Sequence, residues 1–321
     1  MSPELILSCT IFVVSLFILI LAADYFTMAA EKIGVYFGIK PFIIGVTVVA
    51  IGTSLPELVS SILATLKDSS EIVIGNVIGS NIANICLILG VASIITPRAM
   101  VVKYDLLSVD LPLFAGAAFF LAFTIKDLQF TSGEAFMCLV GLVIYLLYTV
   151  STTQEFEEED KEEKEKREEL RKKPIYGQFL ILIVSGLLIF LAANYTIDSI
   201  TQIASSLKIG KEIIAVSAVA VGTSLPELVV TIKAARIGQP EMAVGNILGS
   251  NIFNSFAVMG IPGLMNQLVI PDSVLRDGIP VMLAVTILFF FTTQNNKVSK
   301  WEGWLFIVIY VWFIGKTLSV F

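Results

Sequence analysis

Long apolar segments separated by short polar connectors run along almost the whole chain. The hydrocarbon core of a bilayer requires about 20 apolar residues per helix, and the apolar segments have about this length. The pattern therefore predicts ten membrane-spanning helices, which places both termini on the same side of the membrane. The predicted spans cover residues 5–23, 42–66, 72–95, 106–125, 131–150, 176–193, 212–236, 243–264, 273–291 and 302–320.

The composition supports a polytopic membrane protein. Of the 321 residues, 56% are hydrophobic and only 15% are charged, whereas a soluble domain carries about 25% charged residues. Much of the charge lies in one segment between the fifth and sixth spans, TQEFEEEDKEEKEKREELRKKP. We expect residues 151–174 to form a solvated cytoplasmic linker, because this stretch is too short to fold alone.

Charge and residue types exclude several classes of function. The net charge of -6 leaves no basic face for nucleic acid. The absence of histidine removes the usual zinc ligand and the usual proton relay at neutral pH. The three cysteines, Cys9, Cys86 and Cys138, stand alone in apolar runs and are interpreted as small buried hydrophobes. We expect no enzymatic activity, no cofactor and no obligate protein partner.

The distribution of Lys and Arg predicts the orientation, because these residues are enriched in cytoplasmic loops. With the charged linker in the cytoplasm, 15 of the 21 basic residues lie on that side. The sequence thus predicts a multi-pass protein of the cell membrane with both termini outside.

An internal duplication organises the chain. Residues 21–85 align with residues 191–255 without gaps at a constant offset of 170, and 29 of the 65 pairs are identical. Each half contains five predicted spans, an odd number, so the second copy must enter the membrane from the opposite side. The predicted fold is all-α, with ten transmembrane helices arranged as two inverted five-helix repeats, residues 1–150 and 175–321. Secondary transporters share this plan and bind their substrates between the repeats near the midplane.

The motif GTSLPEL occurs in the middle of the second and seventh spans, at 52–58 and 222–228. Its Gly and Pro weaken the helix, because Pro lacks an N–H and clashes with the preceding turn. Carbonyl groups freed in hydrocarbon need a cavity, water or an ion as a partner. Carbonyls, hydroxyls and one carboxylate per repeat make an all-oxygen set, which suits hard cations such as Ca²⁺ and Na⁺.

Glu57 and Glu227 are the strongest candidates for ion ligands. A carboxylate at bilayer depth costs about 2.5–3.5 kcal/mol on insertion scales, and no Lys or Arg lies within the same helical turn. A protonated carboxyl in a packed core is the structural alternative. Two symmetry-related copies beside broken helices favour an ion site.

The segments GNVIGSNIAN (75–84) and GNILGSNIFN (245–254) supply further polar groups. Their glycines permit close helix approach. Polar residues at positions i, i+4 and i+8 share one helix face, which suits hydrogen bonding between helices or ion contact. These residues are Asn76, Ser80 and Asn84 in the first copy and Asn246, Ser250 and Asn254 in the second.

GTSLPE followed about 20 residues later by GNxxGSN, twice over, resembles the α-repeats of the cation/calcium exchanger superfamily, especially its prokaryotic sodium/calcium exchangers. The resemblance covers essentially the whole chain. It implies that spans one and six slide past a rigid core to alternate access. It also implies a cluster of cation sites in which Glu57 and Glu227 serve both calcium and sodium.

The other ligands follow from the same resemblance. The Thr53 and Thr223 carbonyls would complete the calcium site, and Asn84 and Asn254 would occupy the centre. Two flanking sodium sites would be lined by Ser54, Ser80 and the Ala50 carbonyl, and by Ser224, Ser250 and the Ala220 carbonyl. Many relatives carry Asp where this chain has Asn254, which argues here against potassium dependence.

The resulting hypothesis is electrogenic exchange of sodium for calcium. Calcium/proton antiport on the same fold is the alternative, because two glutamates could instead carry two protons. A channel, or a membrane protein without transport activity, explains the paired glutamates and broken helices less well.

Overall fold

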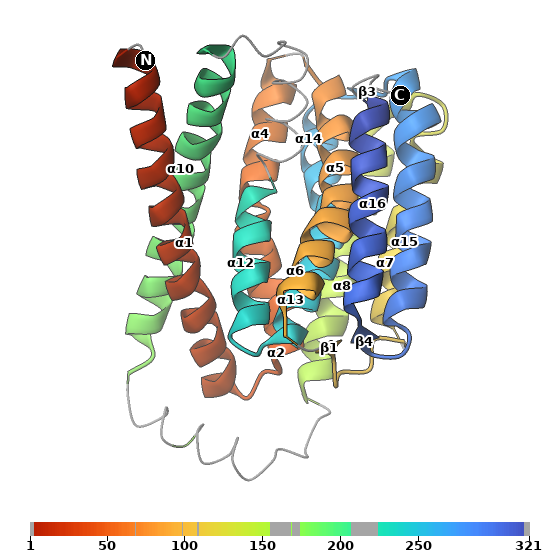
Figure 1. The fold of residues 1–321 in the computed structure, drawn as a ribbon. Coiled ribbons are helices and arrows are strands. Elements are labelled where there is room, and N and C mark those ends of the chain that lie inside the picture. The colour runs from red at the N-terminus through yellow and green to blue at the C-terminus, as the bar shows by residue number, and fades with distance from the viewer. Residues whose placement is uncertain are drawn as a thin grey trace.

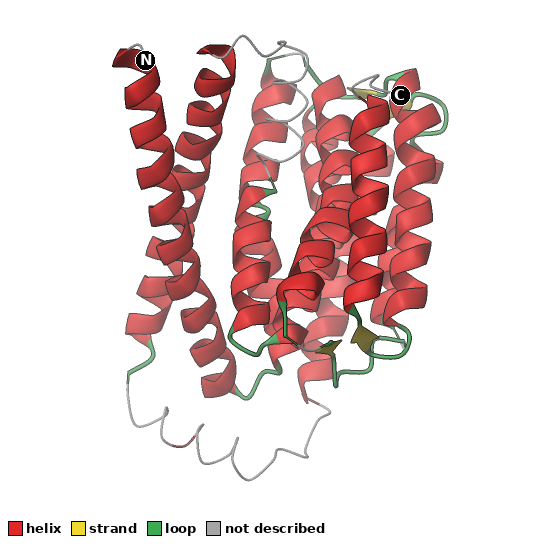
Figure 2. Cartoon of the chain, in the orientation of Figure 1, coloured by secondary structure: helices red, strands yellow, loops and turns green. Residues whose placement is uncertain are grey.

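The computed structural model describes residues 3–67, 69–97, 99–107, 109–154, 168, 174–206 and 224–317. In these ranges helices dominate, joined by short connections with four two-residue strands (Figure 2). The elements up to residue 154 are α1 (Pro3–Phe37), α2 (Pro41–Ile44), η1 (Gly45–Val49), α3 (Ala50–Thr53), α4 (Leu55–Leu66), α5 (Glu71–Ala83), η2 (Asn84–Leu89), α6 (Gly90–Ile95), β1 (Met100–Val101), α7 (Asp110–Thr124), β2 (Gln129–Phe130) and α8 (Ser132–Gln154).

The elements after residue 174 follow a similar order. They are α10 (Tyr176–Ser206), α12 (Leu225–Arg236), α13 (Pro240–Phe253), η3 (Asn254–Val258), α14 (Met259–Met265), β3 (Leu268–Val269), η4 (Val274–Gly278), α15 (Ile279–Thr293), β4 (Lys297–Val298) and α16 (Lys300–Thr317). The η elements are π-helical turns that continue the neighbouring α-helices.

Six helices in the described part of the chain are long and apolar enough to cross a membrane. A seventh span results if the bent pair Pro41–Thr53 and Leu55–Leu66 is counted as one. Helices also lie in the other predicted windows: α7 is apolar but has 15 residues, 12 residues of α12 are described, and α16 carries three charged residues. A multi-pass all-helical protein is therefore confirmed, whereas length and hydropathy alone do not reach the predicted ten spans.

The third and eighth predicted spans, which carry the GNxxGSN segments, form the centre of the bundle. In the apolar windows of α5–α6 and α13–α14, 72% and 89% of the residues are buried, against 22% in α1 and 28% in α10. The long helices α1 and α10 pack along each other at one side of the bundle (Figure 1). These two peripheral helices therefore lie together beside the buried centre of the bundle.

The α1 helix extends well beyond the predicted first span, which ended at residue 23. It continues to Phe37 and includes Asp24 and Glu31, both beyond the predicted span. Similarly, α10 continues to Ser206 rather than ending at residue 193. Both helices are therefore longer than the predicted membrane spans.

Glycines allow α13 to pack against the second span at backbone distance. A Cβ added to Gly45 would lie 2.5 Å from the Met242 carbonyl oxygen, and one added to Gly245 would lie 2.6 Å from that of Phe42. One added to Gly249 would lie 2.6 Å from the Cα of Val46. Real side chains cannot occupy such positions, so the predicted role of Gly245 and Gly249 in close helix approach is confirmed. The same prediction is wrong for Gly75 and Gly79, because a Cβ added to either would meet no described atom within 4 Å.

The strands form two small antiparallel sheets at opposite ends of the bundle. β1 pairs with β4 through Met100 and Val298, and β2 pairs with β3 through Phe130 and Leu268. The N and C labels lie at one end of the bundle, which we call the terminus end; α8 ends and α10 begins at the other, the loop end (Figure 1). Each sheet joins a strand from the first half of the chain to one from the second.

Candidate functional site

Both copies of the GTSLPEL motif start a helix directly after the same serine. Ser54, between α3 and α4, has φ −89° and ψ 4°, and Ser224, before α12, has φ −85° and ψ 8°. Pro56 and Pro226 follow in the first turns, and the second span bends there by 40°. The predicted break in the second span is thus present at Ser54, while at Ser224 the described residues show the start of α12 with nearly the same backbone angles. Both α4 and α12 start in the interior of the protein.

Glu57 and Glu227 lie in the first turns of these two helices. Each is only 1% exposed, and neither forms an ion pair with a described residue. The N-terminus of a helix carries a partial positive charge, which favours a carboxylate there. The first turns of α4 and α12 therefore hold two acidic groups in the core without a described basic partner.

Hydrogen bonds connect the two copies of the motif. Ser54 donates from its hydroxyl to Glu227 Oε1 at 3.0 Å. The Thr53 hydroxyl donates to Asn246 Oδ1 at 3.2 Å, and the Ala50 carbonyl accepts the Ser54 N–H at 3.0 Å. The Ala50 carbonyl thus remains in the helical hydrogen-bond ladder, and it also accepts the Thr53 hydroxyl at 3.4 Å.

Several oxygen atoms at this centre are buried without a hydrogen-bond partner. Of the eleven such side-chain atoms in the described part of the chain, seven belong to predicted site residues. They are Glu57 Oε1 and Oε2, Glu227 Oε2, Asn84 Oδ1, Asn254 Oδ1, Ser224 Oγ and Ser250 Oγ. An unpaired buried polar group costs about 1–3 kcal/mol, so this concentration of oxygens indicates a place for a cation.

The chemistry of these oxygen atoms suits the two ions predicted from the sequence. Carboxylate, amide and hydroxyl oxygens are hard ligands suited to Ca²⁺ and Na⁺. The described residues contain no group of three or more His, Cys, Asp or Glu that could hold a metal. The site therefore depends on two carboxylates and several neutral oxygens.

The first polar positions of the GNxxGSN segments connect neighbouring helices. The Asn76 amide donates to Ser60 and Ser61 hydroxyls on α4 at 3.3 and 3.4 Å. In the second half, Asn246 donates to the Thr231 hydroxyl on α12 at 2.8 Å. These contacts attach α5 to α4 and α13 to α12, the helix–helix role that the sequence left open.

The last polar positions lie at a structural feature that the sequence did not predict. The π-helical turn η2 begins at Asn84, and η3 begins at Asn254. Such turns are rare and are often found at functional sites. Both asparagines, and Ser80 and Ser250, are buried, so these four predicted ligands all lie in the core.

Two predicted ligands, Ala220 and Thr223, lie outside the described residues. The other ten candidates lie in the described part of the chain, and all ten are buried: Ala50, Thr53, Ser54, Glu57, Ser80, Asn84, Ser224, Glu227, Ser250 and Asn254.

Asn81 and Asn251 are buried residues of the centre that the sequence did not single out as functional. They accept hydrogen bonds from the Asn254 and Asn84 amides at 3.2 and 2.8 Å. Their repetition at the constant offset was the available signal.

Three other acids were expected near span ends. Glu134 fits this expectation, since it is half-buried in the first turn of α8 and accepts the Thr131 N–H at 2.7 Å. Asp110 begins α7 but is fully buried, with Tyr148 donating to it at 3.2 Å. Asp24 lies inside α1 and pairs with Lys233 of α12 at 2.8 Å, because α1 is longer than predicted.

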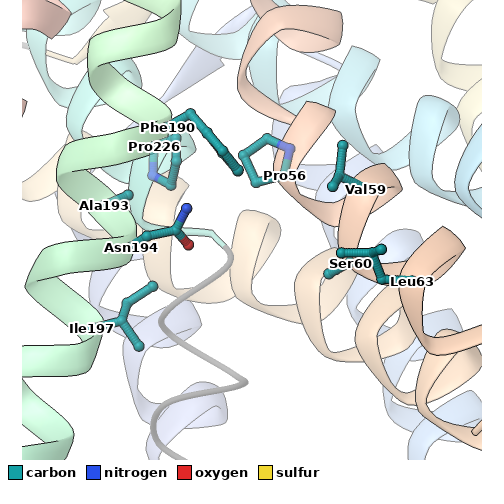
Figure 3. A pocket seen from close by; sticks show the side chains of 9 residues that line it. All are labelled: Pro56, Val59, Ser60, Leu63, Phe190, Ala193, Asn194, Ile197 and Pro226. Atoms are coloured by element: carbon teal, nitrogen blue, oxygen red, sulfur yellow. The ribbon is translucent and has the colours of Figure 1, made fainter. Parts of the chain in front are cut away.

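A cavity of about 250 Å³ lies beside the glutamates, between α10 and α4. Pro56 and Pro226, each next to one of the glutamates in sequence, line this cavity. Ala193, Asn194 and Ile197 line it from α10 (Figure 3). Both α10 and α4 run toward the terminus end from there (Figure 1). The cavity therefore extends from the helix breaks toward the terminus end.

The long apolar helices define a polytopic membrane protein, with buried oxygen atoms that lack hydrogen-bond partners among the described residues. The sequence model of the family described as "Sodium/calcium exchanger protein" matches residues 7–154 and 177–317. The chain belongs to this family.

Individual relatives are similar over nearly their full length. Sodium/calcium exchanger MaX1 of Methanosarcina acetivorans is 35% identical over 95% of this chain and 96% of its own. Inner membrane protein YrbG of Escherichia coli is 35% identical over 89% and 88%. A solved structure of the sodium-calcium exchanger NCX_Mj soaked with Na⁺ and Sr²⁺ superposes with a TM-score of 0.83 at 30% identity, covering 97% of this chain and 99% of the other.

Proposed function

We propose that the protein is a secondary-active antiporter that exchanges Na⁺ for Ca²⁺ across the membrane. The observation that carries this proposal is the set of seven buried oxygen atoms without hydrogen-bond partners among the described residues. The family and the relative MaX1 are both named for this exchange, and NCX_Mj is described as a sodium-calcium exchanger.

The proposed ligand roles are those implied by the resemblance. Glu57 and Glu227 serve both ions, and the Thr53 and Thr223 carbonyls complete the calcium site. Asn84 and Asn254 occupy the centre. The flanking sodium sites use Ser54, Ser80 and Ala50 on one side, and Ser224, Ser250 and Ala220 on the other. The burial of the ten described candidates in one core supports this assignment.

The proposed architecture has ten spans in two inverted repeats, residues 1–150 and 175–321, joined by the linker 151–174. Equivalent positions support it. The helices that start after Ser54 and Ser224 differ by the offset of 170, and so do the π-turns that start at Asn84 and Asn254. The two sheets support it as well. β1 and β3 follow the motif-bearing spans of the two halves, and each pairs with a strand of the other half.

The charges of the two glutamates and the bound ions make the proposed exchange electrogenic. Two ionised glutamates balance one Ca²⁺, so the calcium-loaded centre is neutral. Three Na⁺ in the same place would leave one net positive charge. Moving this charge through 100 mV is worth roughly 2.3 kcal/mol, so a membrane potential drives the exchange. Because the ions share ligands, each transition carries one ion type.

Alternating access would use α1 and α10, the two peripheral helices. At the terminus end the cavity beside Pro56 and Pro226 supports an open path to the site. At the loop end α1 is bound to the core through Asp24 and Lys233, and Gln239 donates to Glu31 of α1 at 3.1 Å. These contacts support a state that is open at the terminus end and closed at the loop end.

The orientation follows from the distribution of basic residues. We place the protein in the cell membrane with the linker in the cytoplasm and both termini outside, so that the cavity faces outward. The ions and the lipid bilayer are its proposed partners.

Calcium/proton antiport is the alternative function. The site has two carboxylates, which could bind two protons in place of one Ca²⁺, and such an exchange would move no net charge. The test is ⁴⁵Ca²⁺ uptake into proteoliposomes loaded with Na⁺, K⁺ or acidic choline buffer. Uptake that requires internal Na⁺ supports the proposed function. Uptake driven by the proton gradient without Na⁺ would replace it with proton coupling, and uptake independent of any counter-ion gradient would indicate a channel.

A further inference from the structure

Four buried asparagines meet across the two halves of the chain. Asn84 donates from Nδ2 to Asn251 Oδ1 at 2.8 Å, and Asn254 donates from Nδ2 to Asn81 Oδ1 at 3.2 Å. The two bonds are equivalent under the offset of 170. All four side chains are at most 4% exposed. We call Asn81, Asn84, Asn251 and Asn254 the asparagine cluster.

An amide side chain offers an oxygen acceptor on one side and an NH₂ donor on the other. A neighbour that accepts a hydrogen bond from the NH₂ therefore also decides where the oxygen points. In the asparagine cluster both central amides donate to a neighbouring asparagine, and both of their oxygens are left without a partner among the described residues. The same residue thus has a satisfied donor and a free acceptor in a buried position.

The accepting asparagines are themselves fixed by further bonds. Asn81 donates from Nδ2 to the Ser255 hydroxyl at 3.1 Å, and Asn251 donates to the Asn81 backbone carbonyl at 3.3 Å. The difference between the halves follows from the sequence, because the first half has Ile85 at the position equivalent to Ser255. With their NH₂ groups engaged, both asparagines must present oxygen to the central amides.

We propose that Asn81 and Asn251 are positioning residues that hold Asn254 and Asn84 with their oxygens toward the cation and their NH₂ groups away from it. The proposal rests on the proposed function, because it assumes that Asn84 and Asn254 face a cation. A flipped amide would present partial positive charge to the ion instead of a ligand oxygen. Asn81 and Asn251 therefore act on ion affinity without touching the ion.

The test compares two substitutions of one residue. Asn81→Asp keeps an oxygen acceptor for the Asn254 amide, whereas Asn81→Leu has a similar volume and no acceptor. We expect Asn81→Leu to weaken Ca²⁺ and Na⁺ binding about tenfold or more, the effect of losing one hydrogen bond or ligand oxygen to a charged group. Asn81→Asp should not weaken binding. Ser255→Ala removes only the outer bond to Asn81, so its effect should be smaller than that of Asn81→Leu.

The measurements are calorimetric Ca²⁺ binding, Na⁺ competition, and thermal unfolding without ions, all on purified full-length protein. A merely structural role would lower the unfolding temperature while leaving the dissociation constants of the folded protein unchanged. Asn251→Leu tests the equivalent residue and replaces Asn81→Leu if that variant does not fold. Unchanged Ca²⁺ and Na⁺ affinity in a folded Leu variant would overturn the proposal.

The outcomes separate this inference from the proposed function. If the wild-type protein binds neither Ca²⁺ nor Na⁺, the proposed function fails and the inference fails with it. If the wild type binds both ions and the Asp and Leu variants weaken binding equally, the proposed function stands and the orienting role is refuted.

Discussion

The ion pair between Asp24 and Lys233 provides a test of alternating access that uses the internal symmetry of the chain. Asp24 of α1 and Lys233 of α12 meet at 2.8 Å on the loop side of the helix breaks. The equivalent residues at the offset of 170 are Asn194 and Leu63, which line the cavity toward the terminus end. One pair of equivalent positions is thus in contact, and the other is separated by a cavity.

Replacement of Lys233 by Leu gives the loop end the residue that the terminus end already has. The two side chains are 27% and 32% exposed, so solvent and lipid headgroups weaken the pair. Partly exposed pairs contribute up to about 1 kcal/mol, which corresponds to a factor of about five in an equilibrium constant. Lys233→Leu and Asp24→Asn should therefore each raise the ratio of loop-open to loop-closed protein by up to about fivefold.

The assay measures the accessibility of one cysteine at each end. Thr27 of α1 is fully buried, and its equivalent Ile197 lines the cavity. In a background lacking the three native cysteines, Thr27→Cys should react with a membrane-impermeant thiol reagent up to about fivefold faster when Lys233 is replaced. Ile197→Cys should react more slowly in the same variant.

Two controls use the same positions. The exchanged pair Asp24→Lys with Lys233→Asp should restore the original rates. The pair Asn194→Asp with Leu63→Lys should shift the rates the opposite way, since it allows an ion pair at the terminus end. An unchanged or slower Thr27→Cys reaction in Lys233→Leu would refute the reasoning.

Three further predictions concern packing, ion binding and charge. Gly249→Ala should destabilise the protein by about 1–3 kcal/mol in thermal unfolding, the usual effect of overpacking, because the added Cβ overlaps the Val46 backbone. Gly116→Ala is the matched control, since its added Cβ meets no described atom within 4 Å. Ca²⁺ at one hundred times its dissociation constant should stabilise the folded protein by about 2.7 kcal/mol, and a scan with chelator in place of Ca²⁺ should lose this increment. Sodium-driven calcium uptake should increase when a potassium–valinomycin potential favours the charge movement, and a rate independent of potential would exclude electrogenic exchange.

The sequence predicted those parts of the fold that depend on local pattern. Hydrophobic runs predicted helices in the expected windows, and Gly and Pro in GTSLPEL predicted the break at Ser54 and the helix start after Ser224. The ends of α1 and α10 could not be found in the same way, because a helix can continue through polar residues such as Asp24 once neighbours satisfy them. Hydropathy measures the membrane boundary, which is not the end of a helix.

The candidate site was predicted as a set of residues but not as a network. Duplication and burial of charge identified Glu57 and Glu227 without any structure. The bond from Ser54 to Glu227 joins residues 173 positions apart, and no local pattern reports such a contact. The π-turns at Asn84 and Asn254 were also missed, since they arise from packing around the site rather than from the propensity of the residues.

The central claim is that Glu57 and Glu227 together form the site that exchanges the two ions. The most direct measurement is sodium-dependent ⁴⁵Ca²⁺ uptake by proteoliposomes containing the wild type, Glu57→Gln or Glu227→Gln, with folding checked by size-exclusion chromatography. We predict uptake in the wild type, and its loss in each folded variant, because one remaining carboxylate cannot balance a divalent cation. Sodium-driven uptake that persists in either folded variant would contradict the account.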